Sequence, residues 1–262
     1  MMNGFDLKLQ SDSSRDYSLR DDVERVSTGV NGLDNLLNGG YPKGSVILIS
    51  GTPGTGKTIL CFQFLYAGLT QGENCLYLSS DEPIKNLIQE ASKFNMDFQR
   101  FIETGKLRLL YLDPDNGNLH EEIQKEISNQ GYSRIIVDSL SPLAETPIWM
   151  VSNGQEIIPS ANSINSISYP VESIQAMRMR LRCLMGLLKE HPSTVLVTSE
   201  IPEGSKTLSR DSISEFLADG IILLGLDPTM DRRKLIIRKM RKTKHTLKPQ
   251  NIEIGSEGIR IL

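Results

Sequence analysis

Residues 46–58 read VILISGTPGTGKT, and this stretch decides the fold. Residues 46–50 form a short apolar run bounded by glycine, which is typical of a central strand covered on both faces. Residues 51–58, GTPGTGKT, fit the pattern G-x-x-x-x-G-K-[ST] of the phosphate-binding loop. Residues 57–70 continue as an apolar segment of helical length. Strand, loop and helix follow in the order that the motif needs, so we expect a nucleotide-binding α/β domain.

The loop gives each residue type a chemical role. Its glycines let successive backbone N–H groups point at phosphate oxygens, and the helix that follows presents its positive dipole end. Lys57 would contact the β- and γ-phosphates, and Thr58 would offer its hydroxyl to Mg²⁺. The alternative is a glycine-rich turn with a coincidental Gly-Lys-Thr, which the flanking strand and helix disfavour. The predicted nucleotide-binding residues are Gly51, Thr52, Pro53, Gly54, Thr55, Gly56, Lys57 and Thr58.

A second motif supplies a carboxylate for the metal ion. Residues 134–139 read RIIVDS, an apolar strand that ends in an acid at the carboxyl edge of the sheet. This is the Walker-B arrangement, in which Asp138 would hold Mg²⁺ through water or through Thr58. The alternative is that Asp138 only caps the next segment. We therefore predict Thr58 and Asp138 as the residues of a magnesium site.

Hydrolysis also needs a group that orients or deprotonates the attacking water. The predicted strand at residues 75–78 is followed by SSDEP, which places Asp81 and Glu82 together. In the usual winding of such a sheet they would sit beside the strand of the phosphate-binding loop. The alternative is a helix N-terminus with acids in its first turn and Pro83 at its first position, and both readings can be true.

Strand and helix patterns alternate along the rest of the chain. This order predicts an α/β fold with a mostly parallel central sheet and helices on both faces. The last strands lack intervening helices, so we expect an antiparallel edge at the C-terminus. Further strands are expected at residues 107–112, 135–137, 195–198, 221–224, 234–241, 251–254 and 259–261. Further helices are expected at residues 33–37, 84–94, 119–130 and 171–190.

Composition excludes several classes of protein. The 262 residues carry 29 Lys and Arg against 32 Asp and Glu, a formal charge of −3. Residues 1–24 are polar and without periodicity, so we expect a tail, and residues 146–170, with the sole tryptophan Trp149, should form a long loop. No apolar run is long enough to span a membrane, and no signal peptide is visible. Three cysteines without paired spacing argue against disulfides and zinc and favour the cytoplasm.

Six motifs occur in order: STGVNGLDNLLNGGYPKG, GTPGTGKT, SSDEP, RIIVDSLS, EFLADGIILL and IRKMRKTKH. Together they resemble the KaiC-like branch of the RecA-type ATPases. The resemblance covers residues 25–262, which we expect to form a single domain. It implies a RecA-like core, ATP with Mg²⁺, and self-association into a ring such as a hexamer, or into a filament, with the nucleotide between subunits.

The resemblance also assigns roles by position. Asp81 and Glu82 take the place of the family's Glu-Glu pair, whose first member is usually the general base. Asp81 is shorter by one methylene, so slow turnover is expected and either acid can be the base. With Lys57 they are the predicted catalytic residues. Residues 239–245, KMRKTKH, follow a K-x-R-G-x-x-H pattern whose Lys, Arg and His reach the neighbouring subunit's nucleotide, although Lys242 replaces the glycine. These trans-acting residues are Lys239, Arg241 and His245.

The residues themselves lend this assignment some support. On a strand, Lys239 and Arg241 point to the same side, roughly 7 Å apart, and an arginine donated in trans stabilises a transferring phosphoryl group. The alternative is a charged edge strand that discourages sheet-to-sheet pairing. Residues 232–248 hold nine Lys and Arg and no acid, while the other residues hold 20 basic and 32 acidic groups. We expect this positive charge to lie at an interface that touches a neighbour's ATP.

The sequence also bears on two other activities, autophosphorylation and DNA binding. Glu215 and Phe216 occupy the places of a Ser/Thr pair that is autophosphorylated in the family's clock proteins, so autokinase activity is not expected there. DNA binding is possible but disfavoured, because residues 146–170 lack Lys and Arg and residues 232–248 lack Phe, Tyr and Trp for base stacking. We predict a regulatory or assembly ATPase with a protein partner that the sequence does not identify. The alternatives are an accessory factor in DNA recombination resembling RadA paralogues, and a nucleotide-binding scaffold with negligible hydrolysis.

Overall fold

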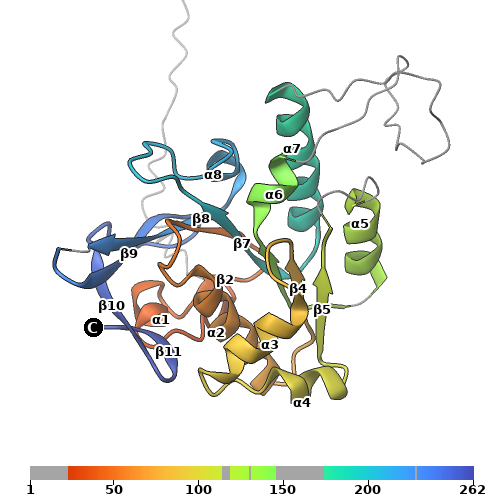
Figure 1. Cartoon of the computed structure of the whole chain (residues 1–262), viewed down its shortest axis with the longest axis horizontal. Coiled ribbons are helices and arrows are strands. Elements are labelled where there is room, and N and C mark those ends of the chain that lie inside the picture. The colour runs from red at the N-terminus through yellow and green to blue at the C-terminus, as the bar shows by residue number, and fades with distance from the viewer. Residues whose placement is uncertain (1–22, 114–118, 130, 146–173, 228) are drawn as a thin grey trace, which may run out of the picture.

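The computed structural model describes residues 23–113, 119–129, 131–145, 174–227 and 229–262 (Figure 1). All but the last two residues of the predicted tail at 1–24 lie outside this part of the chain, as does the predicted loop at 146–170 with Trp149. Within the described residues, no helix is long and apolar enough to cross a membrane.

One large sheet organises the molecule. Its spatial order is β11 (Gly258–Ile261), β10 (Gln250–Gly255), β9 (Arg232–Met240), β8 (Gly220–Asp227), β3 (Val46–Gly51), β7 (Thr194–Glu200), β6 (Arg134–Asp138), β4 (Cys75–Ser79) and β5 (Leu107–Tyr111). The six strands from β8 to β5 are parallel, and β9, β10 and β11 add antiparallel pairs. The predicted mostly parallel sheet with an antiparallel C-terminal edge is therefore confirmed.

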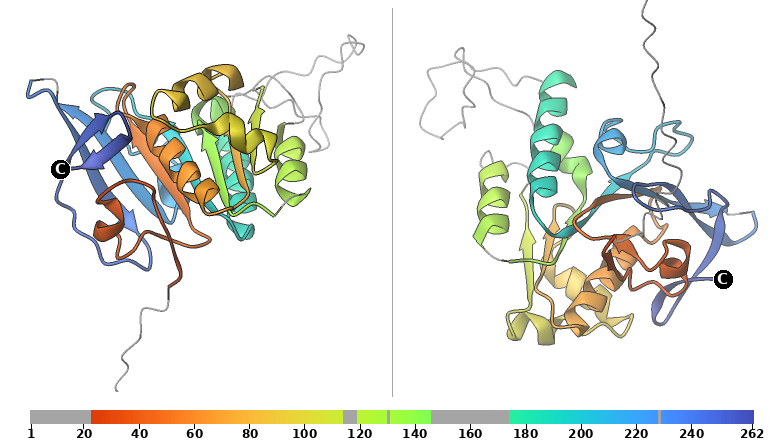
Figure 2. Two further views of the ribbon diagram at one scale, coloured as in Figure 1. Left: turned by 90° about the horizontal axis from the view of Figure 1, so that it is seen from below. Right: turned by 180° about the vertical axis from the view of Figure 1, so that it is seen from behind.

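Helices cover both faces of this sheet (Figure 2). One face carries α1 (Leu33–Leu36), α2 (Lys57–Thr70), α3 (Ile84–Ser92) and α4 (Phe98–Glu103). The other carries α5 (Leu119–Asn129), α6 (Leu140–Glu145), α7 (Ile174–Glu190) and α8 (Ser214–Leu217). Strand β3 shows why both are needed, because Ile47 and Ile49 join the first core while Val46 and Leu48 join the second. Its continuous apolar run is thus buried on both sides.

A small antiparallel ribbon precedes the main sheet. It pairs β1 (Arg25–Val26) with β2 (Tyr41–Pro42), and α1 lies between them in sequence. The sequence patterns did not predict β1, β2, α4, α6 or α8, which are two to six residues long. Elements this short contain too few residues to show a helical or strand period.

Candidate functional site

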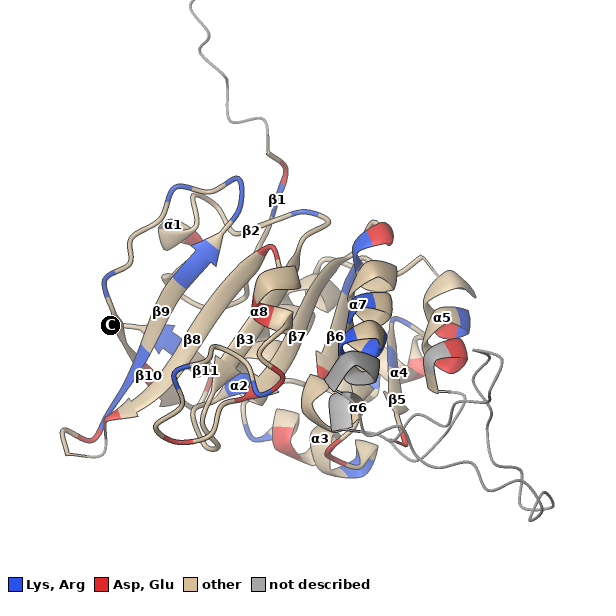
Figure 3. Ribbon diagram, turned by 90° about the horizontal axis from the view of Figure 1, so that it is seen from above, with Lys and Arg blue, Asp and Glu red and all other residues tan. Residues whose placement is uncertain are grey.

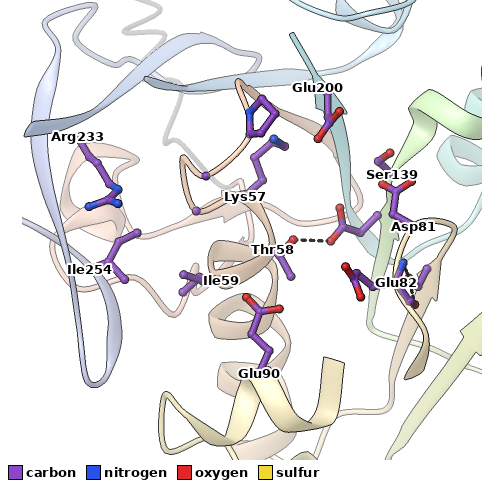
Figure 4. Close-up of a pocket in the computed structure, with 15 residues that line it drawn as sticks. Lys57, Thr58, Ile59, Asp81, Glu82, Glu90, Ser139, Glu200, Arg233 and Ile254 are labelled. Atoms are coloured by element: carbon purple, nitrogen blue, oxygen red, sulfur yellow. Dashed lines mark hydrogen bonds between the residues drawn. The ribbon is translucent and has the colours of Figure 1, made fainter. Parts of the chain in front are cut away.

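A cavity of about 540 Å³ opens at the carboxyl ends of the parallel strands. Figure 4 shows that it lies between the phosphate-binding loop, the end of β6 and the segment after β4. The lining residues are Pro53, Gly54, Gly56, Lys57, Thr58, Ile59, Ser79, Asp81, Glu82, Glu90, Asp138, Ser139, Glu200, Arg233 and Ile254. The volume suits a small-molecule ligand, and such crevices are where open α/β sheets bind theirs.

The loop before α2 takes a conformation that depends on glycine. Gly54 and Gly56 have φ angles of 78° and 100°, in the left-handed region that side chains disfavour. Gly56 is the residue before the first turn of α2, so this bend turns the backbone into the helix N-terminus. Residues 57–59 of that first turn line the cavity, and the free N–H groups at the start of a helix bind phosphate.

Lys57 is held on the loop that it would serve. Its Nζ donates to the carbonyl oxygens of Gly51, at 3.0 Å, and Thr52, at 3.2 Å. Only 9% of the residue is exposed, and this burial lowers the pKa of its ammonium. The negative charges of Glu200 and Asp138 raise that pKa and so partly oppose the effect of burial. The predicted loop residues that do not line the cavity stabilise the conformation of the loop instead. Thr55 Oγ1, for example, donates to the Thr52 carbonyl at 2.8 Å.

Asp138 lies at the centre of a hydroxyl network. Thr58 Oγ1 donates to its Oδ2 at 2.9 Å, and Tyr77 donates to the same oxygen at 2.5 Å. Thr198 Oγ1 donates to the other oxygen, also at 2.5 Å. A hydroxyl and a carboxylate next to a phosphate-binding loop are hard oxygen ligands of the kind that Mg²⁺ takes together with substrate phosphates and water. The residues present therefore fit that ion.

Asp81 and Glu82 both line the cavity, but not from the expected place. Strands β7 and β6 separate β4 from β3, so these acids do not sit beside the strand of the phosphate-binding loop as predicted. In the sheet, β4 lies three positions away from β3, and the later strands β7 and β6 occupy the two positions between them. Helix α3 begins only at Ile84, with Pro83 as its N-cap, so neither acid lies in a first helical turn.

The two acids are held differently. Burial raises the pKa of Asp81, as do the charges of Asp138 and Glu200, while the nearby Ser139 hydroxyl acts to lower it. Glu82 is fixed by its backbone, whose N–H donates to Ser79 Oγ at 3.1 Å. Its side chain accepts from Asn86 Nδ2 at 3.0 Å. Burial and the neighbouring carboxylates therefore favour the protonated form of Asp81.

Three further charged residues line the cavity that sequence reasoning missed. Strand β7 runs two residues beyond its predicted end, and this places Glu200 opposite Gly51. Glu90 comes from α3, and burial raises the pKa of its carboxyl. Arg233 enters from β9, and its Nε is buried without a hydrogen-bond partner among the described residues. The signal for Glu200 was an acid after a buried run, the same signal that identified Asp138.

The predicted trans-acting residues lie at the other end of the sheet. Lys239 Nζ donates to the Ala218 carbonyl at 2.5 Å, and Arg241 Nη1 pairs with Asp219 at 3.0 Å. These partners directly precede β8, whose first residue Gly220 pairs with Ile47 near the start of β3. The third residue, His245, has its Nδ1 3.2 Å from the Thr246 carbonyl oxygen. None of the three lines the cavity of its own subunit.

The basic segment at 232–248 is consequently divided rather than concentrated, contrary to expectation. Figure 3 shows Lys and Arg at both ends of β9. Arg233 faces the subunit's own cavity, and Lys234 pairs with Asp227 at 3.1 Å. Lys239 and Arg241 lie at the other end of β9, beside the residues that precede β8. A nine-residue strand places its two ends far apart, and a charge count along the sequence does not show this.

Lys242 occupies the position where the resembled motif has glycine. Its φ angle is 55°, which explains why a glycine suits this position. Elsewhere, Glu215 Oε2 accepts from the Leu208 N–H at 2.6 Å, while Phe216 is 72% exposed. In the loop at residues 201–214, which holds two acids, Asp211 is buried and accepts from the N–H groups of Ile213 and Ser214. One of that loop's two acids is therefore engaged in holding α8.

Comparisons with known proteins agree on one family. The sequence profile of the KaiC ATPases matches residues 26–153 and 154–262. Circadian clock oscillator protein KaiC 1 of a Synechocystis strain is 28% identical, over 97% of this chain and 47% of that protein. The chain thus spans about half the length of this clock protein. A UPF0273 protein of Aeropyrum pernix is 31% identical, over 90% of this chain and 93% of its own length.

The fold agrees with these sequence matches. The crystal structure of a KaiC-like protein from Pyrococcus horikoshii superimposes with a TM-score of 0.75 and 30% identity. The match covers 92% of this chain and 99% of that one. With a RecA-like sheet, the phosphate-binding loop and a profile match across most of its length, the chain belongs to the KaiC family of ATPases.

Proposed function

We propose that this protein binds Mg-ATP in the cavity at the carboxyl ends of β3, β6 and β7 and hydrolyses it. The observation that carries the proposal is the 2.9 Å hydrogen bond between Thr58 and Asp138 beside the buried ammonium of Lys57. These groups come from two segments, the start of α2 and the end of β6, and converge where a phosphate-binding loop needs a metal and a cation. We further propose that residues 25–262 act as one domain.

The charges in the cavity are consistent with a metal-bound triphosphate. Five carboxylates line it, against Lys57 and Arg233 as the cations. Bound Mg²⁺ would offset this excess of negative charge and that developing on the phosphates. Thr58 and Asp138 would hold the ion, while Lys57 and the N–H groups of the first turn of α2 would bind phosphate oxygens. Arg233, whose guanidinium has an unpaired Nε, would add a second cation from the opposite wall.

Hydrolysis needs a base near the attacking water. Asp81 is our first candidate, because its carboxyl faces the cavity and has a raised pKa. Glu82 and Glu200 are the other candidates. Asp81 is one methylene shorter than glutamate and reaches less far, so we expect slow turnover. Lys57 would stabilise the charge that develops on the transferred phosphoryl group.

We also propose that a neighbouring subunit completes each site. Lys239, Arg241 and His245 lie at the edge of the sheet opposite the subunit's own cavity, so they can reach a triphosphate only on another copy. Head-to-tail contacts of this kind form a ring, such as a hexamer, when they close and a filament when they do not. ATP occupancy would then govern subunit packing, and a protein partner would read that packing.

Mixing two defective variants tests both proposals together. Lys57→Ala removes the loop's cation, and Arg241→Ala removes the donated arginine. Phosphate release and molecular mass are measured for each variant, for the mixture, and for Arg238→Ala as an exposed arginine of the same strand. We expect each defective variant to be nearly inactive, and the mixture to exceed the sum of the two, because some interfaces then combine an intact loop with an intact arginine.

The outcomes separate the alternatives. Activity of Arg241→Ala equal to wild type in an assembled ring would refute the trans-acting role. Tight ATP binding with negligible phosphate release, even when assembled, would instead indicate a nucleotide-binding scaffold. ATP-dependent, sub-micromolar binding of single-stranded DNA at low salt would favour an accessory factor in recombination.

A further inference from the structure

The connection between β9 and β10 carries the proposed trans-acting arginine and histidine, yet it has no regular structure of its own. Residues 241–249 form neither helix nor strand. The Arg241 N–H donates to the Asp219 carbonyl at 3.0 Å and so fixes the start of the segment. Beyond this point the segment needs other partners to hold one conformation, because a connection of this length otherwise samples many.

Arg25, from the small ribbon before the main sheet, reaches this segment. Its Nη2 donates to the Lys242 carbonyl at 2.8 Å, and its Nη1 donates to Thr243 Oγ1 at 2.5 Å. The same Nη1 lies 3.2 Å from the Leu37 carbonyl oxygen, which it also donates to. One guanidinium therefore ties the two residues after Arg241 to the end of α1. More than 200 residues of sequence separate Arg25 from this segment.

The position of Arg25 is itself fixed. Its backbone pairs with Pro42 in the ribbon of β1 and β2. Asn38, next to α1, makes a further contact with the segment, because its Nδ2 donates to the Lys244 carbonyl at 3.3 Å. Asn38 has a φ angle of 56°, a left-handed conformation that asparagine tolerates better than most residues. Two side chains of one N-terminal unit thus hold three consecutive residues of the segment, 242–244.

We propose that Arg25 is a positioning residue for the trans-acting segment, and that it sets the geometry in which Arg241 and His245 meet the neighbouring subunit's nucleotide. This inference rests on the proposed function. The planar guanidinium donates from two nitrogens to two different residues at once, and a lysine ammonium cannot reproduce that fork. Asn38 assists by the single bond to Lys244.

The test again mixes subunits. Arg25→Ala leaves the phosphate-binding loop of its own subunit intact, since none of the cavity's lining residues contacts Arg25 in the hydrogen bonds described above. We expect phosphate release by Arg25→Ala alone to fall about 10- to 100-fold, because misplacing a catalytic group by about 1 Å costs this much. Its affinity for ATP, measured with unassembled protein, should stay within about twofold of wild type. Mixing it with Lys57→Ala should raise phosphate release above the sum of the two, because Lys57→Ala supplies an intact segment.

Two controls separate positioning from general damage. Arg108→Ala removes a half-exposed arginine that pairs with Glu126 at the other edge of the sheet, and it should behave as wild type. Arg25→Lys should remain impaired. Asn38→Gly keeps the left-handed backbone, removes only the amide, and should show a smaller loss than Arg25→Ala.

Hydrogen exchange gives a readout that does not depend on hydrolysis. In the nucleotide-free protein, Arg25→Ala should speed exchange of the Arg241 amide, which is hydrogen-bonded to the Asp219 carbonyl, and leave the amides of α2 unchanged. Unchanged exchange, a wild-type rate for Arg25→Ala, or no gain on mixing with Lys57→Ala would overturn the inference while leaving the ATPase proposal standing. Absence of phosphate release from the wild type would overturn both.

Discussion

Arg233 and Arg241 stand at opposite ends of one strand, β9. Arg233 lines the subunit's own cavity, whereas Arg241 directly follows the strand and pairs with Asp219 at the other edge of the sheet. Extended chain rises about 3.3 Å per residue, so eight residues separate the two by about 26 Å. One subunit cannot bring both arginines to the same triphosphate. If both act on ATP, they act on two different nucleotides.

The first prediction follows from this separation. Arg233→Ala should weaken ATP binding by about 10- to 100-fold even in unassembled protein, because a hydrogen bond to a charged group contributes about 1.5–3 kcal/mol. Arg241→Ala should leave that affinity unchanged and lower only the rate in the assembly. Titration with a fluorescent ATP analogue, at concentrations where the molecular mass is that of one chain, measures the difference.

Arg232→Ala is the matched control for this prediction. Arg232 is exposed, precedes Arg233 on the same strand, and does not line the nucleotide cavity. It should bind ATP as the wild type does. Equal weakening by Arg232→Ala and Arg233→Ala would show that only the general positive charge of the strand matters.

The second prediction concerns the acid that takes the proton. Burial raises the pKa of Asp81, and a general base is active only when it is deprotonated. If Asp81 is the base, kcat/KM should fall with decreasing pH at a value above the ordinary aspartate pKa of about 3.9. Asp81→Asn should cost about 10²- to 10⁴-fold in kcat, and Asp81→Glu should speed turnover by restoring the missing methylene. Assays of phosphate release, at each pH where the protein stays folded, measure the pH dependence of kcat/KM and the kcat of both variants.

Glu82→Gln and Glu200→Gln decide between the remaining carboxylates. Each substitution removes one negative charge from the cavity. If Asp81 is the base, kcat/KM of both variants should still fall with decreasing pH as it does in the wild type. Glu103→Gln, at the end of α4, is a control outside the cavity. Loss of activity in Glu200→Gln with full activity in Asp81→Asn would transfer the role to Glu200.

Local patterns allowed the phosphate site to be predicted. The loop at 51–58 and the strand that ends at Asp138 can each be recognised from a pattern of about eight residues. The structure brings Thr58 Oγ1 and Asp138 Oδ2 to 2.9 Å although 80 positions separate the two residues. The fold class followed from the alternation of strands and helices, and the elements of nine residues or more lie within about three residues of their predicted bounds. The catalytic and trans-acting roles stay predictions.

Sheet order was beyond the sequence. Neighbouring strands in a parallel sheet need not be consecutive in the chain, so the insertion of β7 and β6 between β3 and β4 had no local signal. Glu200 was missed because β7 runs two residues past its predicted end. Arg233 was missed because its run of charge was treated as one patch, whereas a nine-residue strand places its two ends far apart.

The third prediction tests the hydroxyl network around Asp138. Tyr77 is fully buried, and its hydroxyl donates to Asp138 Oδ2 at 2.5 Å. Tyr77→Phe should raise the Mg²⁺ concentration needed for half-maximal hydrolysis by about 10- to 100-fold, because groups that orient a metal ligand have effects of this size. It should also lower the free energy of unfolding by about 1–3 kcal/mol. Mg²⁺ titration and denaturant unfolding measure the two effects.

Tyr132→Phe is the control for this change. The Tyr132 hydroxyl donates to Glu126 at 2.7 Å, a carboxylate that does not line the cavity. This variant should lose stability without any change in the Mg²⁺ requirement. An unchanged requirement in Tyr77→Phe as well would show that Thr58 and Thr198 suffice to hold Asp138.

The last prediction concerns a buried ion pair at the amino end of β6. Arg134 is 1% exposed, and its Nε lies 2.7 Å from Glu73 Oε2. Its Nη1 also donates to the carbonyl oxygens of Ser27, at 2.8 Å, and Phe64, at 2.7 Å. The guanidinium therefore joins β6, α2 and the segment after β1. Removing it leaves one partly buried carboxylate, whose side chain is 25% exposed, and two carbonyls without their donor.

Arg134→Met should accordingly lower the free energy of unfolding by about 3–5 kcal/mol, the usual cost of breaking a buried pair from one side. Adding Glu73→Gln to it should recover part of the loss, because the unpaired carboxylate is then gone. Arg108→Ala, which breaks a pair whose arginine is 53% exposed, should cost no more than about 1 kcal/mol. Equilibrium unfolding in urea compares the three. A loss in Arg134→Met no larger than that in Arg108→Ala would mean that water replaces the guanidinium, and that the three segments are held together by their apolar contacts alone.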